Sequence, residues 1–372
     1  MEYFVYMTND CNLNCKYCSV LLDCEKNNLP IKPMYKNEEL LHFIEKEQEK
    51  CGQDELTIYF FGGEPTMEFG GIQQLIKDTK AYFPSKEVKF VLHTNGLKST
   101  EIPADVLDNL SLIVYSTNYE MIPQVNLADS YFSRIVDNAR YLRDKTNVPV
   151  NGRLTITEKT SLYTELMQLT PYFKLIYWQL ENCAAFKDFD AFYNTYSYEV
   201  TLAFEWWLQN LREGKMLGYI PFMGVLKFMF FEDSEHAEGK SCTLENTDFL
   251  LCGYGNSLIY VQTDGKCYAC CDNVEGSSHF MGDIKKGINF PKCRPEDTIC
   301  KDCKYFKLCK GRCGRLHREF TESHAREYCK LNAVMFDLFI EHKEELAEIL
   351  AAHPEYKAKL FGWLLDTMEY TP

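Results

Sequence analysis

Short apolar runs alternate with longer amphipathic segments along the first half of the chain. The apolar runs are rich in β-branched and aromatic residues and predict strands over 3–7, 56–61, 88–93, 112–116, 150–155 and 175–180. Apolar residues at helical spacing predict helices over 37–51, 70–82, 104–109, 131–145, 161–173 and 189–212. Repeated strand–helix units predict a parallel sheet, and six of them fit an α/β fold of the partial (β/α)6 TIM-barrel type.

The rest of the chain has a different pattern, with many cysteines and turn residues from about residue 242. The dipeptide Asp264-Gly265 separates two β-like runs and predicts a hairpin over 257–270. From about residue 331 the pattern is helical, with a break at His353-Pro354. We therefore expect a barrel over 1–215, a linker over 216–241, a small cysteine-rich domain over 242–330 and C-terminal helices over 331–372.

Composition narrows the class of protein. Of the 372 residues, 46% are hydrophobic and 25% are charged, which is typical of a globular protein, and the formal net charge of −14 argues against nucleic-acid or anionic-membrane binding. The most apolar stretch, 221–231, is too short to span a membrane and contains Lys227. The N-terminus lacks the pattern of a secretory signal, so we expect a cytoplasmic protein.

Seventeen cysteines in a reducing compartment indicate metal, cluster or redox chemistry rather than structural disulfides. Three of them, Cys11, Cys15 and Cys18, lie just after the first predicted strand. Three thiolates can hold one face of an iron–sulfur cube and leave the fourth iron open to an external chelate. A zinc knuckle that takes its fourth ligand from a distant residue is the alternative.

The spacing Cys-x3-Cys-x2-Cys, with Tyr17 before the third cysteine, resembles the signature of the radical S-adenosylmethionine (SAM) superfamily. The resemblance implies a 4Fe–4S cluster on these cysteines and S-adenosyl-L-methionine on the open iron. Reductive cleavage of that cofactor would yield a 5′-deoxyadenosyl radical that abstracts hydrogen from a substrate. It also implies an electron donor such as flavodoxin or ferredoxin.

The resemblance extends to the end of the second predicted strand. Gly62, Gly63 and Glu64, followed by proline, are similar to the family's GGEP motif, which binds the amino group of the cofactor. The glycines would let the backbone approach a ligand closely, and Glu64 can accept hydrogen bonds from an ammonium group. Without this context the same residues would indicate an ordinary turn.

Three later strand ends carry further candidates for binding the cofactor. Asn95 lies in a Thr-Asn-Gly turn similar to one found near the cofactor in relatives, although a plain Asn-Gly turn is the alternative. Ser116 matches a family serine that contacts the cofactor, but the Asp-Gly that usually follows is absent. Arg153, on the fifth strand, would pair with the methionine carboxylate or face solvent.

The later cysteines match the seven-cysteine spacing of the SPASM domain, which accompanies radical SAM enzymes that mature peptides. The resemblance implies two auxiliary 4Fe–4S clusters, and so three in all. The distal one would be held by Cys300, Cys303, Cys309 and Cys329, and the proximal one by Cys252, Cys270 and Cys313. The fourth proximal ligand stays open between Cys242, Cys267, Cys271 and a substrate group, and zinc is the alternative metal.

Cys271 and Asp272 are the candidate catalytic residues. In the sulfatase-maturing relatives an acidic base directly follows the second cysteine of this pattern, whereas Cys271 has that position here. Asp272 would serve as the base, or be a hydrogen-bonded loop carboxylate. Cys271 would be a cluster ligand or a hydrogen-atom donor.

We therefore expect a radical SAM/SPASM enzyme that cross-links, oxidises or epimerises a residue of a ribosomally made peptide (RiPP). Alternatives are an anaerobic sulfatase maturase that forms formylglycine, a small-molecule dehydrogenase or epimerase, and a non-catalytic zinc-binding module. Only ten residues precede Cys11, so we expect the peptide or protein substrate to bind the barrel directly or through a separate leader-binding protein.

Overall fold

The computed structural model describes residues 1–15, 18, 20, 28–117, 128–181, 185–231, 250–271, 277–363 and 371–372. These residues form two compact units. The first unit comprises residues 1–151 and 254–292, and the second comprises residues 152–231, 250–253 and 293–372. The predicted domain boundaries remain a prediction.

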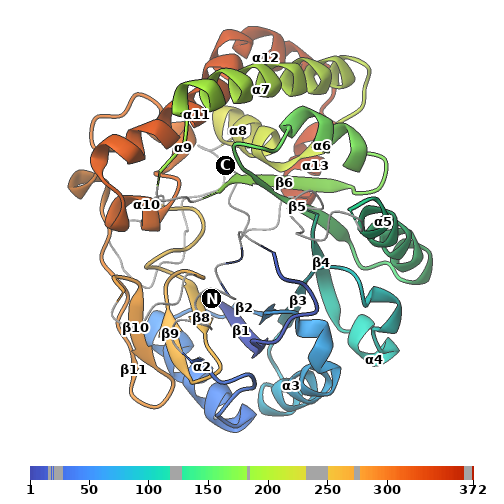
Figure 1. Ribbon diagram of the computed structural model, residues 1–372, viewed down its shortest axis with the longest axis vertical. Helices are drawn as coiled ribbons and strands as arrows, with labels where there is room; N and C mark the ends of the chain where they lie inside the picture. The colour runs from blue at the N-terminus through green and yellow to red at the C-terminus, as the bar shows by residue number, and fades with distance from the viewer. Residues whose placement is uncertain are drawn as a thin grey trace. The chain divides into compact units, whose positions relative to one another are not determined.

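Four parallel strands form the centre of the first unit: β1 (Glu2–Thr8), β2 (Leu56–Gly62), β3 (Val88–Thr94) and β4 (Leu110–Ser116). The helices that follow them are α2 (Asn37–Cys51), α3 (Phe69–Tyr82), α4 (Ala104–Leu107) and α5 (Ala128–Lys145), and α2 to α4 lie outside the strands in Figure 1. All residues from Leu56 to Phe60 of β2 are buried, which is typical of a parallel strand that is covered on both faces. The predicted α/β architecture is confirmed.

The sheet of the first unit continues beyond β1 into the cysteine-rich part of the sequence. Strand β8 (Leu258–Val261) pairs with β1 in parallel, with Glu2 opposite Leu258. The strands β9 (Lys266–Tyr268), β10 (Phe280–Asp283) and β11 (Gly287–Ile288) then add in antiparallel order. The predicted hairpin is confirmed as β8–β9, and Gly265 in its turn has a φ of +84°, which favours glycine.

Strand β5 (Val150–Ile156) begins in the first unit and ends in the second, where it pairs in parallel with β6 (Leu175–Leu180). Strand β7 (Gly218–Tyr219) pairs in parallel with β6. The described helices of the second unit are α6 (Leu162–Leu169), α7 (Phe189–Arg212), α8 (Ile220–Phe231), α9 (Phe306–Cys309), α10 (Gly314–Glu319), α11 (Glu322–Glu341), α12 (Lys343–Ala352) and α13 (Glu355–Trp363).

The segment expected to be a linker, 216–241, contains the buried core helix α8. All residues from Ile220 to Leu226 are buried, and the helix has no polar face, since Lys227 is its one charged residue. A helix of this kind is stable only when other elements surround it. Its lack of a polar face removed the amphipathic signal by which helices are recognised, so α8 left no sign in the sequence. The bounds of the linker remain a prediction.

Aromatic rings from three helices form the core of the second unit. Phe339 of α11 is fully buried, and its ring centroid lies 5.0 Å from that of Phe204 and 5.6 Å from that of Trp207, both on α7. Phe222 of α8 lies 5.9 Å from Phe339. Aromatic pairs at these distances stabilise a core beyond the area they bury.

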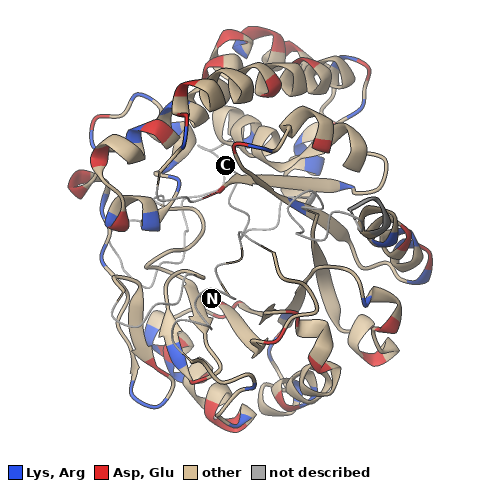
Figure 2. Cartoon of the chain, viewed as in Figure 1, with Lys and Arg blue, Asp and Glu red and all other residues tan. Residues whose placement is uncertain are grey.

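Charged side chains lie mainly on the helices and connecting segments, with few on the strands, as Figure 2 shows. Lys and Arg are interspersed with Asp and Glu on the same helices. Within the described ranges, none of the helices combines the length and apolar character needed to cross a membrane.

We expect Phe339→Ala to lower the free energy of unfolding by about 3–5 kcal/mol, the usual cost of deleting a buried phenylalanine side chain. Ile340→Ala is the matched control, because Ile340 is the next residue of α11 and is 50% exposed. Urea unfolding followed by tryptophan fluorescence should show a lower midpoint for the first variant only. Equal midpoints would contradict this packing.

Candidate functional site

The loop after β1 brings three predicted cluster ligands together. Cys18 N–H donates to the Cys15 carbonyl at 3.1 Å, and Leu13 N–H points at Cys11 Sγ at 3.4 Å. Burial is the main cause that raises the pKa of Cys11 to about 12, and the neighbouring Glu64, Cys18 and Cys15 contribute. Cys15, Cys18 and Glu64 therefore lie near Cys11, and a shared cluster on the three thiols remains a prediction. Tyr17 lies outside the described residues.

Gly62 and Gly63 allow the end of β2 to pack directly against this loop. Gly63 N–H donates to Thr8 O and Glu64 N–H donates to Asp10 O, both at 2.8 Å. A Cβ on Gly62 would meet Thr8 O at 2.2 Å, and a Cβ on Gly63 would meet Asp10 O at the same distance. The glycines thus permit the backbone to approach the segment before Cys11, which is a structural role in addition to the predicted contact with a ligand.

The Glu64 carboxylate is fully buried and connects the ends of β2 and β3. It accepts hydrogen bonds from Thr66 N, Thr66 Oγ1, Thr94 Oγ1 and Asn95 N at 2.5 to 3.0 Å. Burial raises the pKa of Glu64, and these donors oppose the rise. Oε2 accepts one of these bonds and Oε1 accepts three, so the carboxylate positions the loops whether or not it also binds an ammonium group.

Asn95 links this carboxylate to the cysteine loop. Its Nδ2 donates to Asn12 Oδ1 at 2.7 Å, and Asn12 follows Cys11 directly. The Tyr131 hydroxyl, from α5, lies 3.1 Å from Asn95 O and 3.4 Å from the carbonyl of Ser116, whose side chain is exposed. Sequence reasoning missed Asn12 and Tyr131; the position of Asn12 inside the cysteine motif was the available signal.

Arg153 lies in the second unit and is half-buried rather than exposed. Its Nη2 donates to Gln179 Oε1, and its guanidinium lies 5.4 Å from the centroid of the Tyr177 ring. Neighbouring side chains of β6 therefore hold the guanidinium in place. A pairing with a cofactor carboxylate remains a prediction.

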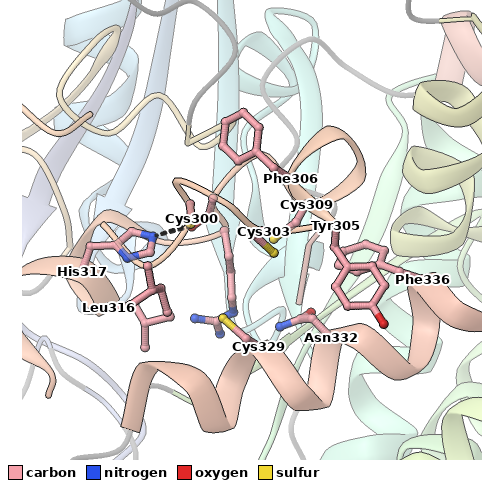
Figure 3. Close-up of a pocket in the computed structure, with 13 residues that line it drawn as sticks. Cys300, Cys303, Tyr305, Phe306, Cys309, Leu316, His317, Cys329, Asn332 and Phe336 are labelled. Atoms are coloured by element: carbon pink, nitrogen blue, oxygen red, sulfur yellow. Dashed lines mark hydrogen bonds between the residues drawn. The ribbon is translucent and has the colours of Figure 1, made fainter. Parts of the chain in front are cut away.

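The four cysteines assigned to the distal cluster line one pocket in the second unit, around which Figure 3 shows their thiols. Burial raises the pKa of Cys309, of Cys300 and of Cys329, the last to about 11, and the nearby thiols add to each shift. In the described ranges, no three His, Cys, Asp or Glu side chains are placed to bind one metal ion. Four thiols around a cavity fit the donor set of an iron–sulfur cluster, which is larger than a single ion.

The residues assigned to the proximal cluster are divided between the units. Cys252 and Cys313 lie in the second unit and Cys270 lies in the first, so their grouping remains a prediction. Cys293, which had no assigned role, lies close enough to Cys300 and Cys313 for both to raise its pKa, although burial is the main cause. The predicted cysteine cluster of the second unit thus has a further thiol beside it.

Two of the possible fourth ligands have described surroundings. Cys267 is completely buried in β9, with its Sγ 3.9 Å from Gly265 O. Cys271 is half-buried, and the Tyr6 hydroxyl holds its carbonyl at 3.1 Å. Cys242 and Asp272 lie outside the described residues.

We expect Gly63→Ala to reduce cleavage of S-adenosylmethionine at least tenfold, because its Cβ must displace Asp10 and the adjoining cysteine loop by about 1 Å. Gly70→Ala is the matched control, since a Cβ at exposed Gly70 of α3 meets nothing within 4 Å. The measurement is 5′-deoxyadenosine released under strong reductant. Full cleavage by Gly63→Ala would contradict the close packing.

Known proteins resemble this chain both in sequence and in fold. Residues 5–158 match the Radical SAM superfamily. Two cysteine-type anaerobic sulfatase-maturating enzymes of Clostridium perfringens are similar. The one from strain ATCC 13124 is 24% identical over 367 residues, with 89% of this chain and 93% of that protein covered. The one from strain 13 is 23% identical over 366 residues, with the same coverage.

Two solved structures agree with this chain over nearly its whole length. Native anSMEcpe with bound AdoMet and the Cp18Cys peptide has a TM-score of 0.66 at 19% identity, covering 94% of this chain and 99% of that one. Native anSMEcpe with bound AdoMet also has a TM-score of 0.66 at 19% identity, covering 95% of this chain and 100% of that one. The chain therefore has the α/β fold of these structures and contains a radical SAM domain over residues 5–158.

Proposed function

We propose that this chain is a radical SAM enzyme that oxidises a side chain in a peptide segment of its substrate. The observation that carries the proposal is the loop of Cys11, Cys15 and Cys18, held beside a buried Glu64 by hydrogen bonds from the ends of β2 and β3. When bound, the clusters would supply the electron that cleaves S-adenosylmethionine and accept the second electron of a substrate oxidation. An electron donor such as flavodoxin or ferredoxin would provide the first electron.

The roles of this chain's residues follow from their placement. Asn95, Tyr131 and the two glycines would hold the cysteine loop in one geometry, so that bound S-adenosylmethionine meets a preorganised site. Ser116 is exposed at the end of β4 and is available to a ligand. Arg153 would neutralise the methionine carboxylate, and Gln179 would keep its guanidinium in place.

The favoured reaction is conversion of a cysteine to formylglycine in a sulfatase. It is supported by two relatives that are cysteine-type anaerobic sulfatase-maturating enzymes and by a solved structure of this fold with a bound peptide. The side chain loses two electrons and two protons to give a thioaldehyde. Bound S-adenosylmethionine would supply the acceptor of one hydrogen atom, while a base would take one proton and an electron acceptor one electron. Water then replaces sulfur, which leaves as hydrogen sulfide.

Modification of a ribosomally made peptide is the second candidate, and the identity of Cys271 favours it. Sulfatase-maturing relatives carry an acidic residue directly after the second SPASM cysteine, whereas Cys271 follows Cys270 here. Tyr6 fixes the carbonyl of Cys271, so the thiol extends from an anchored backbone. A thiol at this place can donate a hydrogen atom or ligate a cluster, which suits epimerisation or cross-linking better than deprotonation. Asp272 remains the proposed base.

We expect the anaerobically reconstituted protein, given dithionite and S-adenosylmethionine, to form an aldehyde on a sulfatase-motif peptide with cysteine at the target position. Hydrazide trapping and mass spectrometry read out the aldehyde. The same peptide with alanine at the target is the control. Cofactor cleavage without aldehyde, but with a modified peptide after co-expression of a neighbouring short reading frame, would favour the second candidate. A colourless, zinc-loaded protein would exclude both.

Two cysteine variants should separate cofactor cleavage from product formation. We expect Cys15→Ala to abolish release of 5′-deoxyadenosine, because two thiolates cannot hold the first cluster with its open iron. Cys309→Ala should keep part of the cleavage and lose product, because its thiol belongs to the other pocket. Chromatography of 5′-deoxyadenosine and mass spectrometry of the peptide measure the two steps. Equal, full turnover in both variants would refute the assignment.

A further inference from the structure

The pocket of the distal cysteines contains polar side chains that are not cluster ligands. Besides the four thiols, Arg312, His317 and Asn332 line it, among apolar side chains such as Ile299, Leu316 and Phe336. His317 and Cys300 are joined by a contact that Figure 3 marks. In surroundings this apolar, a hydrogen bond to a ligand atom has a larger electrostatic effect than it would have in water.

The contacts of His317 determine which ring nitrogen carries hydrogen. Its Nε2 lies 2.8 Å from the carbonyl oxygen of Gly311, which can only accept. Nε2 must therefore carry the hydrogen. The same nitrogen lies 3.7 Å from Cys300 Sγ, within the range of hydrogen bonds to sulfur. Nε2 therefore has two acceptors nearby, the Gly311 carbonyl oxygen at 2.8 Å and Cys300 Sγ at 3.7 Å.

We propose that His317 donates a hydrogen bond to the Cys300 thiolate and thereby raises the reduction potential of the cluster held by Cys300, Cys303, Cys309 and Cys329. The proposal rests on the auxiliary cluster proposed above. A cluster gains negative charge when one electron enters it, and a donor at a ligand sulfur stabilises the reduced form more than the oxidised form. His317 is then a residue that sets the driving force for electron transfer.

Two neighbouring features keep the imidazole in place. His317 lies on α10, which begins directly after Cys313, and Leu316 beside it is buried. The carbonyl that it holds belongs to Gly311, at the centre of three residues with φ values of +54°, +87° and +55°. This left-handed turn joins Cys309 to Cys313, so loss of the His317 contact could also shift these two cysteines. The experiment must therefore separate such a structural effect from an effect on the reduction potential.

The test is an EPR-monitored redox titration of the full-length, reconstituted enzyme with dithionite as reductant. The distal signal is the one that Cys309→Ala removes. We expect His317→Phe, which keeps a ring but no donor, to lower the equilibrium constant for one-electron reduction at least tenfold, which is 59 mV for one electron. His317→Gln, which retains an N–H donor, should restore most of the shift.

His324→Phe is the matched control, since His324 lies on α11 outside the pocket and pairs with Glu327. We expect its distal signal to titrate as in the wild type. An unchanged potential in His317→Phe with the signal retained would overturn the proposal, and so would a shift of equal size in the control. A spectrum in which Cys309→Ala removes no signal would instead refute the auxiliary cluster itself.

A second measurement needs no variant and covers loss of iron from His317→Phe. The wild-type enzyme labelled with ¹⁵N-histidine is reduced and examined by pulsed EPR. We expect a ¹⁵N coupling on the distal signal, because Nε2 lies beside a ligand sulfur. Absence of this coupling from the wild-type distal signal would overturn the proposal.

Discussion

The site around Cys11, Cys15, Cys18 and Glu64 depends on the close approach of two backbone segments that leave no room for a side chain between them. Gly62 and Gly63 place the end of β2 against Thr8 and Asp10, and the two 2.8 Å hydrogen bonds across this contact lock the residues that lead into Cys11. The described residues between β1 and Cys18 form no helix or strand. The geometry of this cysteine loop therefore comes from the strand ends beside it.

The buried carboxylate of Glu64 extends this constraint from β2 to β3. A charge removed from water is costly unless donors surround it, and Glu64 receives its donors from the two loops that must be aligned. Asn95 uses its backbone for this carboxylate and its side chain for Asn12 of the cysteine loop. The same hydrogen bonds that make burial of the carboxylate tolerable therefore also position the cluster ligands.

The sequence was sufficient to predict those helices and strands whose residues follow a regular pattern of apolar and polar positions. The six strands of the alternating region and α2, α7 and the β8–β9 hairpin were found close to their observed bounds, because burial on one face produces a regular pattern. The pairing of β8 with β1 was not foreseen, since contacts between residues more than 250 positions apart leave no periodic trace. Helix α8 was missed because it has no polar face.

The same division applies to the site residues. Cysteine spacing was enough to group Cys300, Cys303, Cys309 and Cys329, which do line one pocket, because ligands of one cluster recur at short intervals. It carried no information about Gln179 or His317, whose roles depend on which strand or helix lies beside Arg153 or Cys300. Such partners are chosen by tertiary structure alone.

The turn between Cys309 and Cys313 shows how tertiary structure also sets backbone conformation. Lys310 and Arg312 adopt left-handed φ values that cost roughly 1–2 kcal/mol for each such residue. The Arg312 guanidinium lies 4.7 Å from the Tyr328 ring and within 3.5 Å of the Leu180 carbonyl, and Leu250 N–H donates to the Lys310 carbonyl at 2.7 Å. Together these contacts hold the turn in its strained conformation. Because of the turn, Cys309 and Cys313, which are only four residues apart, can serve as predicted ligands of different clusters.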